Sequence, residues 1–439
     1  MAVPPIISRR FSDLDWRLLL LIIPPISLLI LLSISFNPIN HFSSFAPLAS
    51  HFLNKTSLIT LPSTTLTTNY SSTAPPSLPL VNRSESTQWK DELERSRMAV
   101  CLVGGARRFE LTGPSIVKNI LQVYPNADLF LHSNFDKDAF KFSLLKTVPK
   151  LASVRIISPK PLPETLAQLR VLTAANSPNG IQGLLQYFNL VEGCLRMIQE
   201  YQNLKGFQYD WIVRTRVDGY WNAPLGPENF IPGHYMVPPG STYGGLNDRL
   251  GIGDLKTSTI ALSRLSLVPQ LDAAGFRQLN SETAFKAQLT TRGVPFDTKR
   301  VPFCVVSDRK YEFPPGRFGV PVAALSSPGP LSGAKCRPCK PVCEGTCVAG
   351  IMPSLYKGWS WTNWENGTLK LCDAHGDWEG GWERIFDKVA GKELASERKR
   401  IRGLSRKRCV DDFTEMKKKA SKWDTPPVEE ICRLGLGEN

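Results

Sequence analysis

Three charged residues follow an apolar run in the segment Arg214-Thr-Arg216-Val-Asp218. Side chains alternate along a strand, so Arg214, Arg216 and Asp218 share one face. A carboxylate at the end of a buried strand is costly unless it is paired or bound to a cation. Two interpretations stay open: an internal ion-pair ladder, or a site in which Asp218 holds a divalent metal or a sugar hydroxyl while an arginine meets a diphosphate.

A second group of candidates is the Gly-rich segment 247–254, which contains Asp248 and Asp254. Two carboxylates in such a loop can position an acceptor hydroxyl or serve as a general base, and glycines let the backbone approach a ligand closely. A plain polar turn is the alternative. Glu282 presents a similar choice. It lies in the first turn of a helix predicted from Asn280 to Leu289, where it complements the helix dipole, and the second interpretation is an acceptor-site carboxylate.

Arg107 and Arg108 follow Gly104-Gly105 in a turn after the first apolar run. Backbone amides together with a guanidinium can meet a phosphate there. The segment has neither a Walker loop nor a G-x-G-x-x-G pattern. Solvated surface arginines are therefore the alternative interpretation.

Alternating strand and helix patterns position these residues. Apolar runs predict strands at 98–103, 127–132, 154–157, 211–213, 235–237 and 259–262. One helix is predicted to open at Gly113-Pro114, and another runs from Ser177-Pro178 to Ile198 with apolar residues at i, i+3 and i+4. This order indicates an α/β fold with a mainly parallel sheet flanked by helices, whose ligands bind beyond the carboxyl ends of the strands.

Composition narrows the class of protein. The chain has 439 residues, a formal charge of +14 and 42% hydrophobic residues, enough for a large core. Between Arg384 and Lys422 there are 14 Lys/Arg and 6 Asp/Glu, a local charge of 14 − 6 = +8. The basic run at 398–408 imitates a nuclear signal. Because an N-terminal membrane anchor argues against a nucleic-acid partner, a solvated helix face or a contact with anionic glycans or lipid headgroups is expected instead.

The anchor is predicted at residues 18–36, nineteen residues without a charge. At a rise of about 1.5 Å per residue this stretch is about 28 Å long, close to the thickness of a bilayer core. Arg9, Arg10 and Arg17 precede it, so the positive-inside rule leaves the N-terminus in the cytosol. A cleaved signal peptide is the alternative.

Glycosylation signals and composition agree with a lumenal location. Sequons occur at Asn54, Asn69, Asn82 and Asn366, all beyond the anchor. Three of them fall in a Ser/Thr/Pro-rich stretch that cannot bury a core and is typical of an extended stem.

The cysteines also lie beyond the anchor. Seven of them predict a disulfide framework in an oxidising compartment, with a zinc site as the alternative for the closely spaced ones: Cys336, Cys339, Cys343, Cys347, Cys372, Cys409 and Cys432. Cys101 and Cys194 sit in apolar segments and are expected as buried free thiols. Five of the ten tryptophans fall within 359–382, and we expect them to form the core of a small Cys-rich module, with sugar stacking as the alternative.

Taken with the anchor and stem, the order of the long helix, the strand at 209–213 and the acidic motif at Asp218 resembles a Golgi glycosyltransferase of the GT-A nucleotide-sugar fold. The segments 101–109 and 244–254 are similar to a plant family of unknown function with this architecture. The resemblance covers about 97–309. It implies a nucleotide sugar as donor, with Arg107, Arg108, Arg214, Arg216 and Asp218 as donor-binding residues, and Asp248 and Asp254 near a glycan or glycoprotein acceptor.

The resemblance departs from GT-A enzymes at one position. Those enzymes usually carry Asp-x-Asp, which binds Mn²⁺ and the donor diphosphate, whereas this chain has Arg216-Val-Asp218. Asp218 remains the candidate metal ligand, and Arg216 can instead neutralise the diphosphate directly. A non-catalytic lumenal glycan-binding or scaffold protein is the alternative function.

The predicted organisation is therefore a single-pass type II protein of the Golgi membrane. It has a cytoplasmic tail (1–17), a transmembrane signal anchor (18–36), a lumenal stem (37–96), a GT-A-like α/β domain (97–325) and a smaller Cys/Trp-rich basic C-terminal region (326–439).

Overall fold

The structure is a computed structural model that describes residues 83–175, 177, 179–311, 322–354 and 368–437. The predicted anchor, the four sequons and the tryptophans at 359, 361 and 364 lie outside these residues. Within the described ranges, no helix is both long and apolar enough to cross a bilayer.

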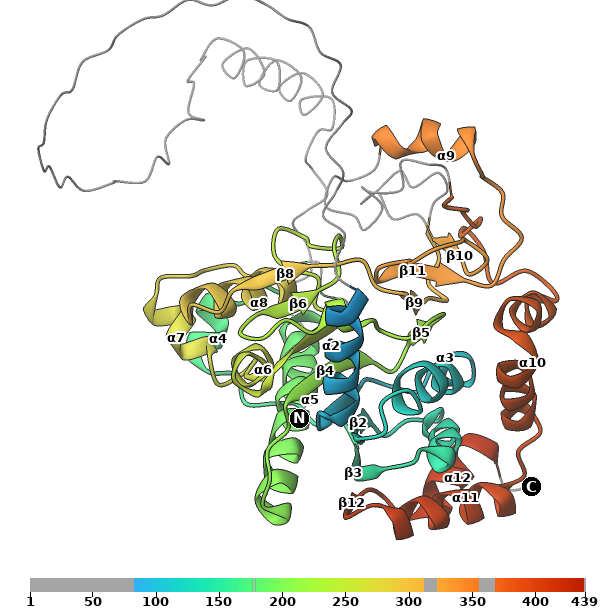
Figure 1. The fold of residues 1–439 in the computed structure, drawn as a ribbon, viewed down its shortest axis with the longest axis horizontal. Helices are drawn as coiled ribbons and strands as arrows, with labels where there is room; N and C mark the ends of the chain where they lie inside the picture. The colour runs from blue at the N-terminus through green and yellow to red at the C-terminus, as the bar shows by residue number, and fades with distance from the viewer. Residues whose placement is uncertain (1–82, 176, 178, 312–321, 355–367, 438–439) are drawn as a thin grey trace, which may run out of the picture. The chain divides into compact units, whose positions relative to one another are not determined.

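A mainly parallel eight-stranded sheet organises the fold, as predicted (Figure 1). Its strands are β1 (Met98–Val103), β2 (Ala127–Asn134), β3 (Leu151–Ile157), β4 (Trp211–Arg216), β6 (Tyr235–Val237), β7 (Leu250–Asp254), β8 (Phe296–Thr298) and β12 (Lys422–Asp424). Their spatial order is β12-β3-β2-β1-β4-β7-β6-β8. Among the described strands of this sheet, β7 alone runs antiparallel to its neighbours. Five of the six predicted strands are confirmed as β1, β2, β3, β4 and β6.

Helices surround the sheet on both faces. They are α2 (Arg83–Arg95), α3 (Phe109–Ile116), α4 (Leu166–Val171), α5 (Gly180–Lys205), α6 (Leu255–Leu262), α7 (Val268–Ala273), α8 (Ser281–Thr291), α9 (Thr346–Ile351), α10 (Trp382–Arg402), α11 (Arg406–Lys419) and α12 (Val428–Leu436). Shorter turns are the π-helical η1 (Val117–Leu121) and the 3₁₀ turns η2 (Ala139–Thr147), η3 (Pro227–Asn229) and η4 (Met352–Ser354).

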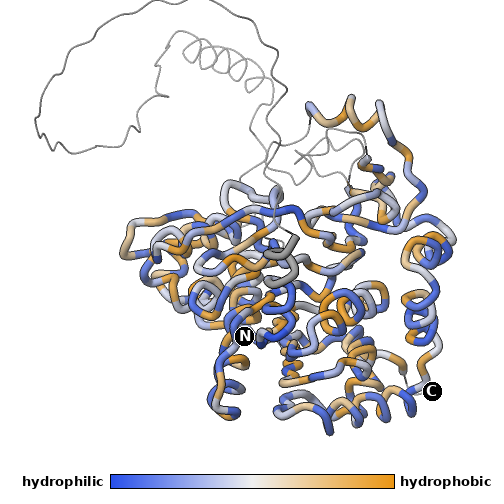
Figure 2. The backbone as a smooth tube through the Cα atoms, in the orientation of Figure 1, coloured by the Kyte–Doolittle hydropathy of each residue, from blue (hydrophilic) through white to orange (hydrophobic). Residues whose placement is uncertain are grey.

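Strand alternation divides the core into two layers. Cys101 and Ile212 face α5, whose buried Val191 and Ile198 pack against them. Val100 and Val213 face the other layer, formed by α3, η1, η2, α11 and α12. The helices accordingly alternate between hydrophobic and hydrophilic residues along their length (Figure 2). The 3.6-residue pattern of α5 was therefore a reliable signal.

A smaller sheet joins the two regions that the sequence separates at residue 325. It has the order β10-β11-β9-β5 and consists of β5 (Gly219–Trp221), β9 (Phe303–Val306), β10 (Ala323–Ala324) and β11 (Ala334–Arg337). Strand β12 likewise returns to pair with β3 in the main sheet. The C-terminal region thus completes both sheets and packs against the α/β part. Helix α2, which the sequence places in the stem, also contacts it through buried Leu93.

Two predicted elements differ from the structure. Residues 259–262 form the end of α6, not a strand, because Asp254 caps this helix by accepting from the Thr257 amide at 2.8 Å. Gly113-Pro114 lies inside α3, which begins four residues earlier at Phe109. A methyl group on Gly113 would lie 2.6 Å from the Phe109 ring, so glycine is needed there for packing and does not mark a helix start.

Five disulfides join all ten cysteines. They confirm the predicted framework, with the pairs Cys304–Cys336, Cys339–Cys372, Cys343–Cys347 and Cys409–Cys432. The prediction that Cys101 and Cys194 are free thiols is wrong, because these two residues form the fifth disulfide, which links β1 to α5. No cluster of metal-binding side chains occurs among the described residues, so the zinc alternative finds no support there.

Candidate functional site

The carboxyl ends of β1 and β4 form the topological switch point of the sheet. The chain runs from β1 outward through β2 to β3, then returns to place β4 on the other side of β1. Val103 lies beside Arg216, and the Val217 amide donates to the Val103 carbonyl at 2.9 Å. Crevices at such a reversal are where open α/β sheets bind ligands. The loop at 104–108 and the segment at 217–218 therefore meet at the expected place.

Arg216 and Asp218 form a two-pronged ion pair at this edge. Nε and Nη2 of Arg216 donate to the two carboxylate oxygens of Asp218 at 2.7 and 2.6 Å. The side chains are 35% and 24% exposed, so the pair is accessible from solvent. Burial raises the pKa of Asp218, but the Arg216 guanidinium outweighs it and leaves the pKa below its usual range. Asp218 is therefore a carboxylate with both oxygens occupied.

Further basic residues surround this pair. Lys335 of β11 lies in one row with Val305 and Gly219 across the small sheet, next to Asp218 in the chain. Arg249, which precedes β7, donates through Nη1 to the Gly333 carbonyl, and so reaches the loop before β11. Burial, followed by the charges of Arg249, Arg309 and Arg216, lowers the pKa of Lys335 well below its usual range. One carboxylate is thus surrounded by an excess of positive charge.

This arrangement fits an anion better than a divalent metal. Mn²⁺ in a GT-A enzyme needs free carboxylate oxygens, whereas those of Asp218 accept from Arg216. The nearby Arg249, and Lys335 when it is protonated, would repel a cation. Cationic side chains with unused donors, in contrast, suit a phosphate group. We therefore derive no role for a metal from Asp218.

Arg214 continues the same face of β4 into the core. It is 1% exposed, and its Nε and Nη1 atoms have no hydrogen-bond partner in the described part of the chain. Buried donors without partners are uncommon in native proteins. The Arg214 charge acts on Asp248, whose pKa it lowers together with Arg264. Arg214 therefore connects the Arg216–Asp218 pair to a second polar group of residues.

The second group contains Asp248 and Glu282. Asp248 accepts from the Ser281 hydroxyl at 2.5 Å, and its Oδ2 lies 3.8 Å from Nη2 of Arg264. The Arg264 guanidinium lies between the rings of Phe188 and Phe285, at 4.7 and 4.6 Å from their centroids. Burial raises the pKa of Asp248, but Arg264 and Arg214 outweigh it and the net pKa is lowered. Asp248 is therefore ionised.

Glu282 has the opposite character. Burial, followed by the negative charge of Asp248, raises the pKa of Glu282 to about 8. The loop around Gly245 packs against it so closely that a methyl group on Gly245 would lie 1.9 Å from the Glu282 carbonyl. Two neighbouring carboxyl groups with pKa values moved apart are a frequent acid–base arrangement. The expectation that Glu282 only complements the dipole of α8 is thus incomplete, because a carboxyl group with a raised pKa can also exchange a proton.

Asp254 does not join either group. It lies opposite Trp211 at the start of β4, so it occupies the other end of the sheet from Arg216. There its carboxylate accepts from the Thr257 and Gly233 amides. The expected Gly-rich loop is strand β7 from Leu250 onward, and Gly251 makes room for the Tyr235 ring instead of a ligand. We do not carry a catalytic role for Asp254 further.

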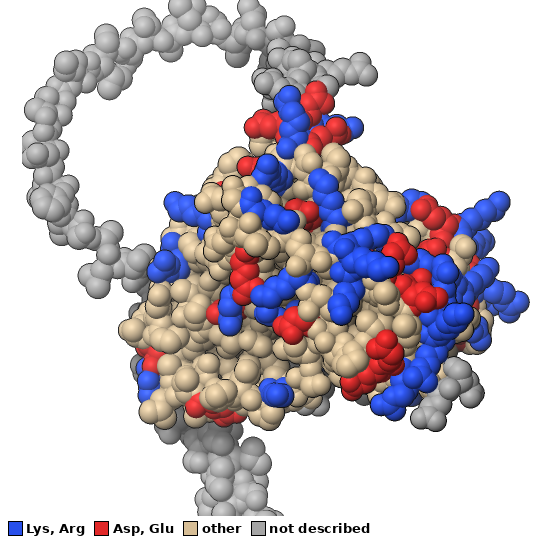
Figure 3. Space-filling model, turned by 90° about the horizontal axis from the view of Figure 1, so that it is seen from below, with Lys and Arg blue, Asp and Glu red and all other residues tan. Residues whose placement is uncertain are grey.

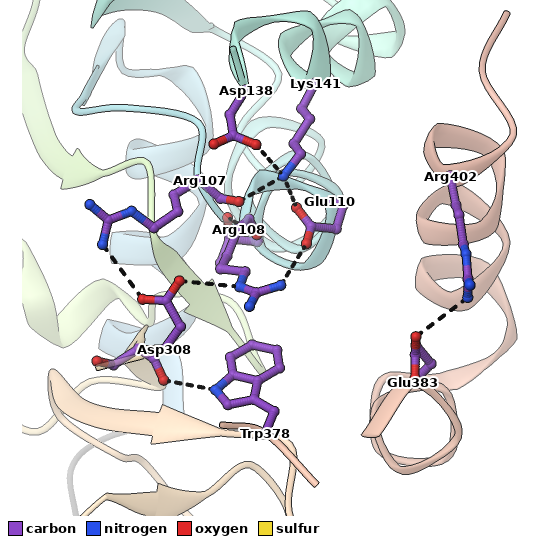
Figure 4. A network of polar contacts seen from close by, with 11 residues as sticks. Arg107, Arg108, Glu110, Asp138, Lys141, Asp308, Trp378, Glu383 and Arg402 are labelled. Atoms are coloured by element: carbon purple, nitrogen blue, oxygen red, sulfur yellow. Dashed lines mark hydrogen bonds and ion pairs between the residues drawn. The ribbon is translucent and has the colours of Figure 1, made fainter. Parts of the chain in front are cut away.

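Arg107 and Arg108 are engaged within the protein (Figure 4). Asp308 contacts both, at 3.5 Å from Arg107 Nη1 and 3.6 Å from Arg108 Nε. Arg108 also lies 4.1 Å above the Trp378 ring, whose Nε1 donates to the Ser307 carbonyl. The Arg107 and Arg108 side chains are 68% and 28% exposed, so Arg107 is the more accessible of the two.

The basic run near the C-terminus is largely paired. Arg398 forms two hydrogen bonds to Asp387, Arg400 contacts Asp412, and Arg402 contacts Glu383. The face seen from below in Figure 1 carries many Lys and Arg side chains interspersed with Asp and Glu (Figure 3). Internal ion pairs on solvated helices thus account for much of this charge.

Sequence reasoning did not identify three residues of the site. Lys335 carries no local motif, since only the small sheet brings it to Asp218. Arg264 is 0% exposed, but it stands just after the apolar helix α6, where an arginine gives no sign in the sequence of being buried. A signal existed only for Arg249, which is part of the Asn247-Asp248-Arg249 sequence.

Comparison with known proteins adds little beyond the family. A search of curated protein sequences finds no significant match. The crystal structure of mouse xyloside xylosyltransferase 1 in its apo form is 13% identical, with a TM-score of 0.31, and the match covers 47% of this chain and 85% of that one. A family model described as a domain of unknown function (DUF7796) matches residues 93–438, well over half of the chain. The chain therefore belongs to the DUF7796 family.

Proposed function

We propose that the protein is a glycosyltransferase that moves a sugar from a nucleoside diphosphate donor to a glycan or glycoprotein acceptor. The observation that supports this proposal most strongly is the excess of positive charge around Asp218 at the switch point of the sheet. The diphosphate of a nucleotide sugar is a ligand that such a site recognises. Arg216, Arg249 and Lys335 would hold its oxygens, with Arg214 behind them.

The chemistry follows from the charge that develops. The bond between the anomeric carbon and the diphosphate oxygen breaks, and a bond from an acceptor oxygen to that carbon forms. The leaving diphosphate gains negative charge, which preorganised cations stabilise more in the transition state than in the ground state. The proton of the acceptor hydroxyl goes to a carboxylate, and we assign this role to the Asp248–Glu282 pair.

We further propose that the protein acts in the lumen of the Golgi as a type II membrane protein. Five disulfides support an oxidising compartment. The apolar run at 18–36 and the sequons at Asn54, Asn69, Asn82 and Asn366 supply the other support. To test this placement, the chain is isolated from secretory membranes and treated with a glycosidase. Faster migration on an electrophoresis gel after treatment would support it.

A non-catalytic glycan-binding protein is the second candidate. The closed Arg216–Asp218 pair favours it, because both carboxylate oxygens are occupied where GT-A enzymes bind a metal. This candidate predicts saccharide binding without consumption of any nucleotide sugar.

Titration calorimetry of the full chain against a panel of nucleotide sugars, with EDTA present, tests the proposal. The wild-type protein should bind at least one donor. Lys335→Gln should weaken that binding at least tenfold, about 1.4 kcal/mol, because it removes the ammonium group that Lys335 forms when it takes up a proton beside the phosphate. Arg292→Gln is the matched control, since Arg292 is exposed at the C-terminal end of α8 and is not among the residues that we assign to the phosphate. Absence of binding to every donor, with and without Mn²⁺, would refute the proposal.

A further inference from the structure

A cavity of about 880 Å³ lies beside β5. Its walls come from β5, η1, the first half of α10 and two loops at 325–329 and 339–341. The volume falls within the range of roughly 300–1,000 Å³ that small-ligand sites occupy. Nothing in the proposed donor site uses this space.

The charges of the cavity are all of one sign. Four cationic residues line it, and no Asp or Glu is among its lining residues: Lys118, Lys340, Arg384 and Lys388. Lys118 contacts Glu393 at 2.5 Å. The side chains of the other three make no ion pair with any described residue, and Arg384 and Lys388 are exposed. The neighbouring Glu379 carboxylate is taken up by the Lys340 amide.

Neutral polar and apolar groups complete the walls. Asn119 and Asn222 place side-chain amides at the cavity, and each uses its amino group on a backbone carbonyl, at 2.8 and 3.4 Å. Their side-chain oxygens remain as acceptors for a ligand hydroxyl. Leu325 and Leu394 provide apolar surface. Cations, amides and small apolar patches in one hollow match a ligand that has both hydroxyls and anionic groups.

The cavity is linked to the donor site by a short stretch of chain. Asp218 is followed directly by β5, and Tyr220 and Trp221 of β5 line the cavity. At about 3.3 Å per residue, Tyr220 is about 7 Å along the strand from Asp218. Strand β5 therefore connects the wall of the cavity to the donor site, although Asp218 itself is not among the residues that line the cavity.

We propose that this cavity binds an acidic saccharide, one that carries carboxylate or sulfate groups. This binding site does not depend on the proposed transferase activity. A hollow of this volume suits a short oligosaccharide, whereas a bilayer presents a flat surface. Hydroxyl-binding amides beside the cations also favour a saccharide over a bare phosphate.

Binding of defined oligosaccharides to the full chain tests the inference. The probes are an oligogalacturonide, a sulfated heparin fragment and a neutral glucan of the same length. We expect at least tenfold tighter binding of one acidic probe than of the glucan, and its affinity should fall with added salt. The acidic probe that binds identifies whether carboxylate or sulfate is recognised.

A pair of charge-matched variants makes the test specific. Lys340→Glu with Lys388→Glu should weaken the acidic probe at least tenfold. Lys417→Glu with Lys418→Glu changes the net charge equally on exposed lysines of α11, and should leave the affinity within twofold. Equal loss in both variants, equal binding of acidic and neutral probes, or equal competition by anionic vesicles or single-stranded DNA would overturn the inference.

Donor binding by the wild-type chain is measured in parallel, so that the two proposals fail separately. Acidic saccharide binding without any nucleotide-sugar binding would refute the proposed transferase and leave the saccharide site in place. Nucleotide-sugar binding without acidic saccharide binding would refute only the cavity assignment.

Discussion

The carboxyl group of Glu282 should make the stability of the fold depend on pH. Its pKa is raised from 4.5 to about 8, first by burial and then by Asp248. The folded chain keeps this proton up to about pH 8, whereas the unfolded chain releases it above about pH 4.5. The unfolded state thus binds fewer protons between these values, and stability falls as the pH rises through them.

The size of the effect follows from the shift. At about 1.4 kcal/mol per pH unit, the free energy of unfolding should fall by on the order of 3–5 kcal/mol between pH 5 and pH 9. Glu282→Gln is a permanent neutral mimic of the protonated acid. It should remove this decline, so the variant should be more stable than wild type at pH 8 and nearly equal to it at pH 5.

Thermal unfolding of the full chain, followed by circular dichroism from pH 5 to pH 9, measures the difference. Glu429→Gln is the matched control, because Glu429 occupies the first turn of α12 as Glu282 does in α8, but is exposed. The control should follow the wild-type curve. If thermal unfolding of wild type and Glu282→Gln depends on pH in the same way, the pKa of Glu282 is not raised in the folded chain. Glu282 would then no longer be a candidate for the catalytic carboxyl pair with Asp248.

Three further predictions concern other parts of the structure. Asp254→Ala removes the cap of α6 and should lower the free energy of unfolding by about 1 kcal/mol in denaturant titrations while nucleotide binding persists; lost binding at unchanged stability would return Asp254 to the site. Replacing Cys101 and Cys194 by serine removes a crosslink with a sequence separation of 93 residues. The chain-entropy model predicts that the free energy of unfolding falls by about 4–5 kcal/mol relative to oxidised wild type in the same titration. An unchanged midpoint would contradict the β1–α5 disulfide. Because the pKa of Lys335 is lowered in the free protein, donor binding should take up a proton at Lys335 and weaken as the pH rises. In calorimetry, the affinity of Lys335→Gln for the donor should depend less on pH than that of wild type. An equal pH dependence in both would argue against contact between Lys335 and phosphate.

The main sheet could be predicted because its signals are local. Apolar runs gave five strands, and the i, i+3, i+4 spacing gave α5. The predicted strand at 259–262 is wrong because apolar and β-branched residues also suit a buried helix. The decisive signal is the helix cap at Asp254, a residue that the sequence also offers as a catalytic carboxylate. Likewise, Gly113-Pro114 is typical of a helix start, but α3 begins one turn earlier at Phe109, whose ring packs against Gly113 within the same helix.

The candidate site was predictable only in part, for a related reason. Arg214, Arg216 and Asp218 share a strand face, and alternation alone indicates this. The partners that decide their chemistry come from elsewhere in the chain. Lys335 arrives through the small sheet, and Arg108 is held by Asp308, 200 residues later in the sequence. The cysteine pairing, Cys101 with Cys194 included, also depends on packing between a strand and a helix that are distant in the chain.

A structure of the full chain with a bound nucleoside diphosphate, prepared without divalent metal, tests the central claim most directly. Our account predicts the phosphates at the carboxyl ends of β1 and β4, within hydrogen-bond distance of Lys335 Nζ and of the Arg216 or Arg249 guanidinium. Phosphates bound beside Arg107, or in the cavity lined by Arg384 and Lys388, would contradict it.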